Sequence, residues 1–98
     1  MSEPDLVEMA RSVIDANRYM VLGTSSPDGS PRVSPVYFTH HGYRDFYWVS
    51  DPGSHHSANV AARPPATAVI FDSTAAVGQG KAVYLTGVAA QVADEDLP

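Results

Sequence analysis

The turn at residues 26–29 constrains the fold of this chain more than any other local feature. The tetrapeptide Ser-Pro-Asp-Gly places proline at the second position and glycine at the fourth position of a type I turn. Strand-like segments flank this turn on both sides, Tyr19–Ser25 and Arg32–Thr39. Two such segments joined by a tight turn are expected to pair as an antiparallel hairpin.

Two prolines modify the prediction for the second of these strands. Proline has no backbone N–H to donate to a β-ladder, and both Pro31 and Pro35 fall in or beside this segment. We therefore expect the strand to begin late and bulge, or to lie on an edge of the sheet near Pro35.

The rest of the chain alternates predicted strands with one short helix. Apolar residues recur at helical spacing from Leu6 to Ile14, with Pro4 just before them, which predicts a leading amphipathic helix. The sequence His40-His41-Gly42 predicts a polar reversal. The further elements expected are a third strand at Asp45–Val49, a helix at Ser54–Ala62 stopped by Arg63-Pro64-Pro65, a fourth strand at Thr67–Phe71, and a fifth at Lys81–Val92 in which Gly87 marks a bulge or a close backbone approach.

This pattern indicates a mainly β (α+β) fold. Strands joined mostly by tight turns, with a leading helix and one short crossover helix, form an antiparallel barrel or a heavily curled sheet. Ninety-eight residues suffice for one domain. The segment Ala93–Pro98 is similar to the capped start of a helix that stops at once. We therefore expect residues 1–98 to be a single domain truncated at its C-terminus, with a free sheet edge that a second copy helps to cover.

Composition excludes several classes of function. Six Lys and Arg against eleven Asp and Glu give a formal net charge of −5, with no basic stripe for a nucleic-acid surface. No apolar run approaches the roughly 20 residues that cross a bilayer. Cysteine is absent, so the chain has no disulfide framework and no thiol nucleophile, which fits a cytoplasmic protein.

Small polar side chains gather where the crossover helix is expected to begin. The stretch Ser50–Asn59 brings serines, a turn glycine and two histidines to a helix N-terminus. Free backbone N–H groups and the positive end of the helix dipole favour an anion there, and a phosphate is the natural one. A simple helix cap by Ser54 is the alternative interpretation, and it is compatible with the first.

The paired histidines do not predict a metal site. Neighbouring residues on a strand point to opposite faces, and neighbours on a helix diverge by about 100°. Neither His40-His41 nor His55-His56 is therefore expected to chelate a metal, and no cysteine is present to assist.

Read in order, these segments resemble a known family. The run Arg32–Tyr37, then Trp48-Val49-Ser50, then Ser54-His55-His56 with Asn59, resembles the pyridoxamine 5′-phosphate oxidase-like proteins, which share the FMN-binding split barrel. The segments 71–74 and 77–87 resemble the actinobacterial-type branch of that superfamily. The resemblance extends from about Leu6 to Val92.

The resemblance implies a flavin-dependent oxidoreductase, a homodimer that binds FMN non-covalently at its interface. The flavin would react with a small-molecule substrate or a reduced nicotinamide donor, and no residue is assigned as a general acid or base. Strand backbone would contact the ring, basic and hydroxyl side chains the phosphate, and a glutamine would come from the opposite subunit. The positions carried over as cofactor-binding are Arg32, Val33, Ser34, Val49, Ser50, Ser54, His55, His56, Gln79 and Lys81.

Several alternatives stay open. Histidine stands at both phosphate positions where the family has Arg or Lys, so the site carries less fixed charge. The deazaflavin F420 is an alternative cofactor, and a flavin or haem carrier without turnover is an alternative function. Arg32 could instead pair with Asp28 at the turn, Arg63 could be a helix C-terminal charge meeting the dipole, and Lys81 could be a solvated strand end.

Overall fold

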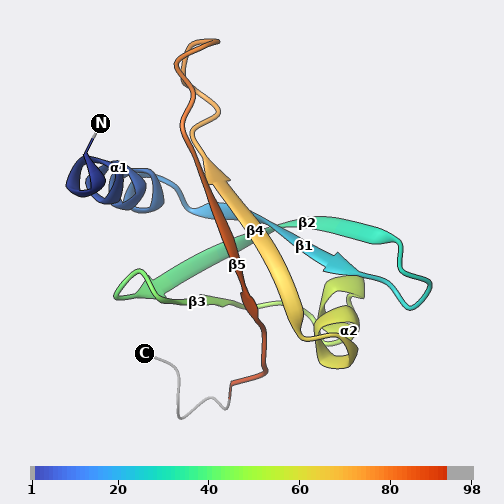
Figure 1. Ribbon diagram of the computed structural model, residues 1–98. Helices are drawn as coiled ribbons and strands as arrows, with labels where there is room; N and C mark the ends of the chain where they lie inside the picture. The colour runs from blue at the N-terminus through green and yellow to red at the C-terminus, as the bar shows by residue number, and fades with distance from the viewer. Residues whose placement is uncertain (1, 93–98) are drawn as a thin grey trace.

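The computed structural model describes residues 2–92 and consists of a five-stranded sheet with two helices (Figure 1). The expected helix start at Ala93–Pro98 lies outside the described residues. In chain order the elements are α1 (Glu3–Ala16), β1 (Tyr19–Ser25), β2 (Pro31–His41), β3 (Asp45–Trp48), α2 (His55–Ala62), β4 (Pro65–Phe71) and β5 (Ala82–Val88). Neither helix is long and apolar enough to cross a membrane.

The sheet is antiparallel throughout, in the order β3-β2-β1-β4-β5. Strand β2 links its two parts, because residues 31–37 pair with β1 and residues 38–41 pair with β3. In Figure 1, β2 and β3 run across the direction of β4 and β5, so the sheet curls into a half-barrel. The predicted curled antiparallel fold, with a leading helix and a crossover helix, is confirmed.

Helix α1 begins with a complete capping box. The Ser2 side chain accepts a hydrogen bond from the Asp5 N–H, while the Asp5 side chain accepts from the Ser2 N–H. The helix packs against β4 and β5 and buries Val13 and Ile14, one turn from its end. This cap and this apolar stripe explain why the helix forms here.

The two faces of the sheet differ sharply. Side chains alternate between faces along each strand, so the register assigns every residue to one of them. The hydrophobic core lies between the inner face of the sheet and α1. Helix α1 contributes Val13 and Ile14, and the sheet contributes Met20, Leu22, Val36, Phe38, Ala68 and Ile70. The outer face of β1, β2, β4 and β5 leaves several large apolar side chains exposed, among them Tyr19, Val33, Tyr37, Tyr84 and Val88.

The two prolines of β2 are accommodated without a bulge, so the expected late start and bulge are wrong. The strand begins at Pro31 and keeps an unbroken register with β1. The Phe38 N–H donates to the Arg18 carbonyl, which places the hydrogen-bonded pairs at every second residue from there. The nitrogens of Pro31 and Pro35 therefore face away from β1, on a side where β3 does not reach, and the expected edge at Pro35 is confirmed.

Strand β5 is shorter than predicted. It ends at Val88, opposite Pro65, and the Ala89 N–H adds one bond to the Pro64 carbonyl. Beyond that point β5 has no partner in β4, because the chain that precedes β4 forms α2. Gly87 marks neither a bulge nor a close approach, since its register is continuous and the space beside it is open.

Candidate functional site: an anion site at the start of α2

The start of α2 presents free backbone donors. Ser54 is the N-cap, and its side chain accepts a hydrogen bond from the Ser57 N–H at 3.3 Å. The backbone N–H groups of His55 and His56, which lie between Ser54 and Ser57 in the chain, have no acceptor among residues 2–92. Asp51 does not occupy them, because its Oδ1 accepts from the Gly53 N–H at 2.9 Å. The helix therefore offers two N–H groups and its positive dipole end to an anion.

Three serine hydroxyls lie beside these donors. Ser50 Oγ and Ser57 Oγ are 2.7 Å apart, and Ser54 Oγ donates to the Asp51 carbonyl at 2.8 Å. A hydroxyl can rotate to donate to a ligand and still accept from a neighbour. The structure thus brings together Ser50 and Ser54, as expected, and adds Ser57, which sequence reasoning missed.

His56 carries an unsatisfied nitrogen. Its Nε2 atom is buried and has no hydrogen-bond partner among the described residues. A buried polar atom without a partner costs about 1–3 kcal/mol and is uncommon in folded proteins. A phosphate oxygen would supply the missing partner, so the residues at this helix end fit a phosphate group. The side chain of His55, in contrast, is exposed.

The predicted residues of β2 and β3 divide between the two faces. Arg32 and Ser34 belong to the inner face, the side of Thr24, against which α2 packs. Val33 belongs to the outer face, and Val49 is 90% exposed just after β3.

Arg32 has a local contact at the turn. Its Nε donates to Ser26 Oγ at 3.3 Å. Hydrogen bonds from Ser30 lower the pKa of Asp28, and the positive charge of Arg32 lowers it slightly further. The alternative role of Arg32 at the hairpin turn therefore has structural support.

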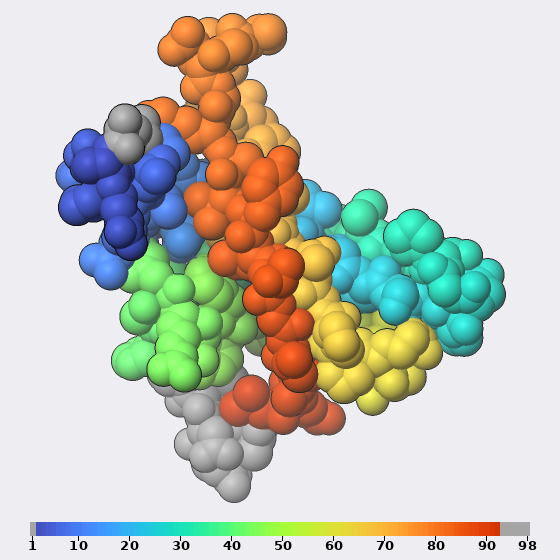
Figure 2. Space-filling view, in the orientation of Figure 1, coloured from blue at the N-terminus to red at the C-terminus, as the bar shows by residue number. Residues whose placement is uncertain are grey.

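Gln79 and Lys81 lie away from this site within one chain. Both belong to the segment between β4 and β5, at the end of the sheet opposite to α2 (Figure 1). Figure 2 shows that this loop projects from the body of the molecule. Its Val77 is fully exposed, and Gly78 adopts a positive φ of 85°. One chain does not bring Gln79 or Lys81 to the start of α2.

A buried polar network attaches α2 to β1, and sequence reasoning missed it. Asn59 is 4% exposed and donates to Thr24 Oγ1 at 3.1 Å, while its Oδ1 accepts from Arg63 at 3.1 Å. Arg63 occupies the C-cap, as a helix C-terminal charge would, and its Nε also donates to the Ser25 carbonyl at 2.7 Å. The Asn-x-x-x-Arg spacing on one helix face was the available signal.

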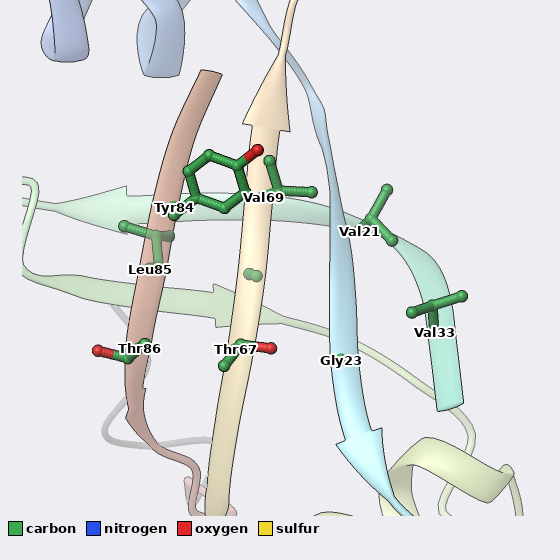
Figure 3. Close-up of a pocket in the computed structure, with 9 residues that line it drawn as sticks. Val21, Gly23, Val33, Thr67, Val69, Tyr84, Leu85 and Thr86 are labelled. Carbon is green, nitrogen blue, oxygen red and sulfur yellow. The ribbon is translucent and has the colours of Figure 1, made fainter. Parts of the chain in front are cut away.

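The outer face is hollowed into a shallow apolar groove of about 330 Å³ (Figure 3). Val21, Val33, Val69 and Tyr84 contribute its side chains. Gly23 keeps its floor flat, because a Cβ at that position would lie 2.7 Å from the hydroxyl oxygen of Thr67.

A second polar cluster joins α1 to the turn between β2 and β3. Asp15 accepts hydrogen bonds from the Tyr43 hydroxyl and from His40 Nε2, and these bonds lower the pKa of Asp15. The hydrogen bond to Asp15 in turn raises the pKa of Tyr43. His40 is the penultimate residue of β2 and not part of the turn, and its Nδ1 accepts from the Tyr43 N–H at 3.1 Å. Both ring nitrogens of His40 therefore take part in contacts within the chain. In the described part of the chain no three His, Asp or Glu side chains gather around a common point.

Comparison with known proteins decides the family. The model of the pyridoxamine 5′-phosphate oxidase family matches residues 6–98. The chain belongs to this family. No curated protein matches the chain.

Several solved structures share the fold of this chain. A haem-binding protein from Mycobacterium smegmatis superposes with a TM-score of 0.80 at 24% identity, over 97% of this chain and 40% of that one. The haem storage protein HutZ from Vibrio cholerae gives 0.70 at 21%, over 96% and 65%. An F420 reductase gives 0.69 at 19%, over 83% and 61%. The chain thus spans between 40% and 65% of the length of these three proteins, and the likeness shows the fold alone.

Proposed function

We propose that this chain binds FMN non-covalently, with the phosphate at the N-terminus of α2, and acts as a flavin-dependent oxidoreductase. The observation that carries the proposal is the buried Nε2 of His56, which has no hydrogen-bond partner among the described residues and belongs to the same first turn of α2 as two free backbone N–H groups. The hydroxyls of Ser50, Ser54 and Ser57 are hydrogen-bonded to one another at this helix end. These groups are donors of the type that a phosphate requires.

The flavin ring would lie against strand backbone near the same helix end. Val33, Ser34 and Val49 are the positions proposed for this contact, and β2 also carries the positively charged Arg32. The bound flavin would supply hydride transfer between a reduced nicotinamide donor or a small substrate and an acceptor. The protein's part is to bind the phosphate, orient the ring and exclude water.

A homodimer is part of the proposal, and the outer face of the sheet is its interface. The register places sixteen outward positions on β1, β2 at residues 31–37, β4 and β5, and none of them is a charged residue. On a chain with a net charge of −5, an uncharged face is where two copies approach with least repulsion. In such a dimer Gln79 and Lys81 would reach the partner's flavin, which they do not approach in their own chain.

F420 and haem are the two alternatives to FMN as the bound cofactor. F420 is supported by the likeness to an F420 reductase, although its phosphate tail would meet little fixed positive charge at α2. Haem, carried without turnover, is supported by two solved relatives described as haem proteins. A cytoplasmic location, compatible with the cysteine-free sequence, belongs to the same proposal.

A titration of flavin fluorescence tests the function. Binding quenches the fluorescence of the flavin. We expect FMN to have a lower dissociation constant than riboflavin, because only FMN presents a phosphate to α2. Equal affinities for the two flavins would contradict the phosphate site. Haem, followed by its Soret band, and F420, followed by its absorbance, are titrated in parallel. Tight binding of either with no binding of FMN would replace FMN by that ligand.

A further inference from the structure

The one fully buried residue of the crossover helix α2 is polar. Asn59 is its only buried residue, and the helix packs mainly against β1. Most surface helices are held by an apolar stripe, and the hydrophobic effect that buries this stripe is non-directional. The position of α2 instead depends on directional hydrogen bonds to Thr24 and Ser25.

The Asn59 carboxamide is committed on both sides. Its nitrogen donates to Thr24 Oγ1, and its oxygen accepts from Arg63, which itself donates to the Ser25 carbonyl. These bonds join two successive turns of α2 to the last two residues of β1. Since the network is buried at Thr24 and Asn59, each lost partner leaves an unsatisfied polar atom, so the arrangement resists small rotations of the helix.

The same rotation sets the geometry of the anion site. His56 precedes Asn59 by three residues, so the two lie on the same face of α2, about 4.5 Å apart along its axis. Turning the helix about its axis would move the buried Nε2 of His56 and shift the free N–H groups of His55 and His56 relative to β1.

We propose that Asn59 is a positioning residue. Through Thr24 and Arg63 it fixes the rotation of α2 that lets the His56 ring and the two backbone N–H groups converge on one phosphate. This inference rests on the proposed function. It adds that recognition of the phosphate depends on a side chain that does not touch it.

The variants Thr24→Val and Thr24→Ser test the proposal with little change in volume. Thr24→Val removes the acceptor of the Asn59 amide, while Thr24→Ser retains it. Thr39→Val, on an exposed residue of β2, is the matched control. The dissociation constants of FMN and riboflavin are measured for each purified full chain, well below its melting temperature. Inorganic phosphate is added as a competitor.

We expect Thr24→Val to weaken FMN binding about tenfold, equivalent to about 1.4 kcal/mol, and to leave riboflavin binding unchanged. Thr24→Ser and Thr39→Val should keep the preference for FMN. A loss of folded protein would lower binding of both flavins equally, so the ratio of the two constants separates positioning from stability.

The outcomes distinguish this proposal from the proposed function. If the wild-type chain prefers FMN and Thr24→Val retains that preference while folded, the positioning role of Asn59 is refuted and the phosphate site stands. If the wild-type chain does not discriminate between FMN and riboflavin, and phosphate does not compete, both inferences are overturned.

Discussion

Replacement of His56 by phenylalanine should weaken ligand binding without destabilising the ligand-free protein. Phenylalanine keeps a ring of similar size but lacks the Nε2 atom that is buried without a partner. Leaving such an atom unpaired costs about 1–3 kcal/mol, so its removal should leave the free energy of unfolding of the ligand-free protein unchanged or higher. A charged hydrogen bond to the phosphate contributes about 1.5–3 kcal/mol, so FMN binding should weaken by roughly 10- to 150-fold.

Two measurements on the same variant check this prediction. Urea unfolding of the ligand-free protein gives the stability, and fluorescence titration gives the dissociation constant of FMN. The control is His41→Phe, the same replacement at an exposed histidine at the end of β2.

Either of two results would refute the reasoning on His56. A stability loss above about 1 kcal/mol in the ligand-free variant would mean that the nitrogen has a partner in the folded protein. An unchanged dissociation constant for FMN would mean that the phosphate does not bind His56. Loss of riboflavin affinity to the same extent would indicate a packing effect on the ring site.

Two further predictions concern the interface and the acid stability. Tyr84→Glu places a charge on the outer face of β5, where the tyrosine is 80% exposed. It should convert the dimer to a monomer in light scattering without lowering the stability of the monomer. A dimer that persists in this variant would place the interface elsewhere. The lowered pKa of Asp15 means that its contribution to stability is present above about pH 4 and is lost as pH falls through the folded pKa. Asp15→Asn should therefore reduce the fall in stability between neutral and acid pH in urea unfolding, and an acid limb identical to that of the wild type would disprove the assignment.

Features that depend on a few neighbouring residues were predicted well from the sequence. The turn at residues 26–29 follows from the φ of proline and the freedom of glycine, and Gly29 has a positive φ of 87°. The start of α2 follows from Ser54, whose side chain caps the helix as expected. The grouping of Ser50, Ser54 and His56 follows in turn from where that helix begins.

Features that depend on pairing with a distant segment were predicted poorly. The length of β5 is set by where β4 begins. The prolines of β2 are tolerated because their nitrogens face the side where β2 has no partner strand, since β3 pairs only with residues 38–41. The contact between Asn59 and Thr24 joins residues 35 apart in sequence, and no local pattern points to it.

The sequence by itself determined the kinds of elements, their turns, and the serines and histidines at the head of one helix, because propensity, capping and turn chemistry act within a few residues. The tertiary structure decided which side chains share a face. A strand alternates its residues between two faces, so a register shifted by one residue would exchange the inner and outer sets. Only pairing of the strands revealed the uncharged outer face, and only the folded structure shows that the His56 Nε2 atom is buried without a partner among the described residues.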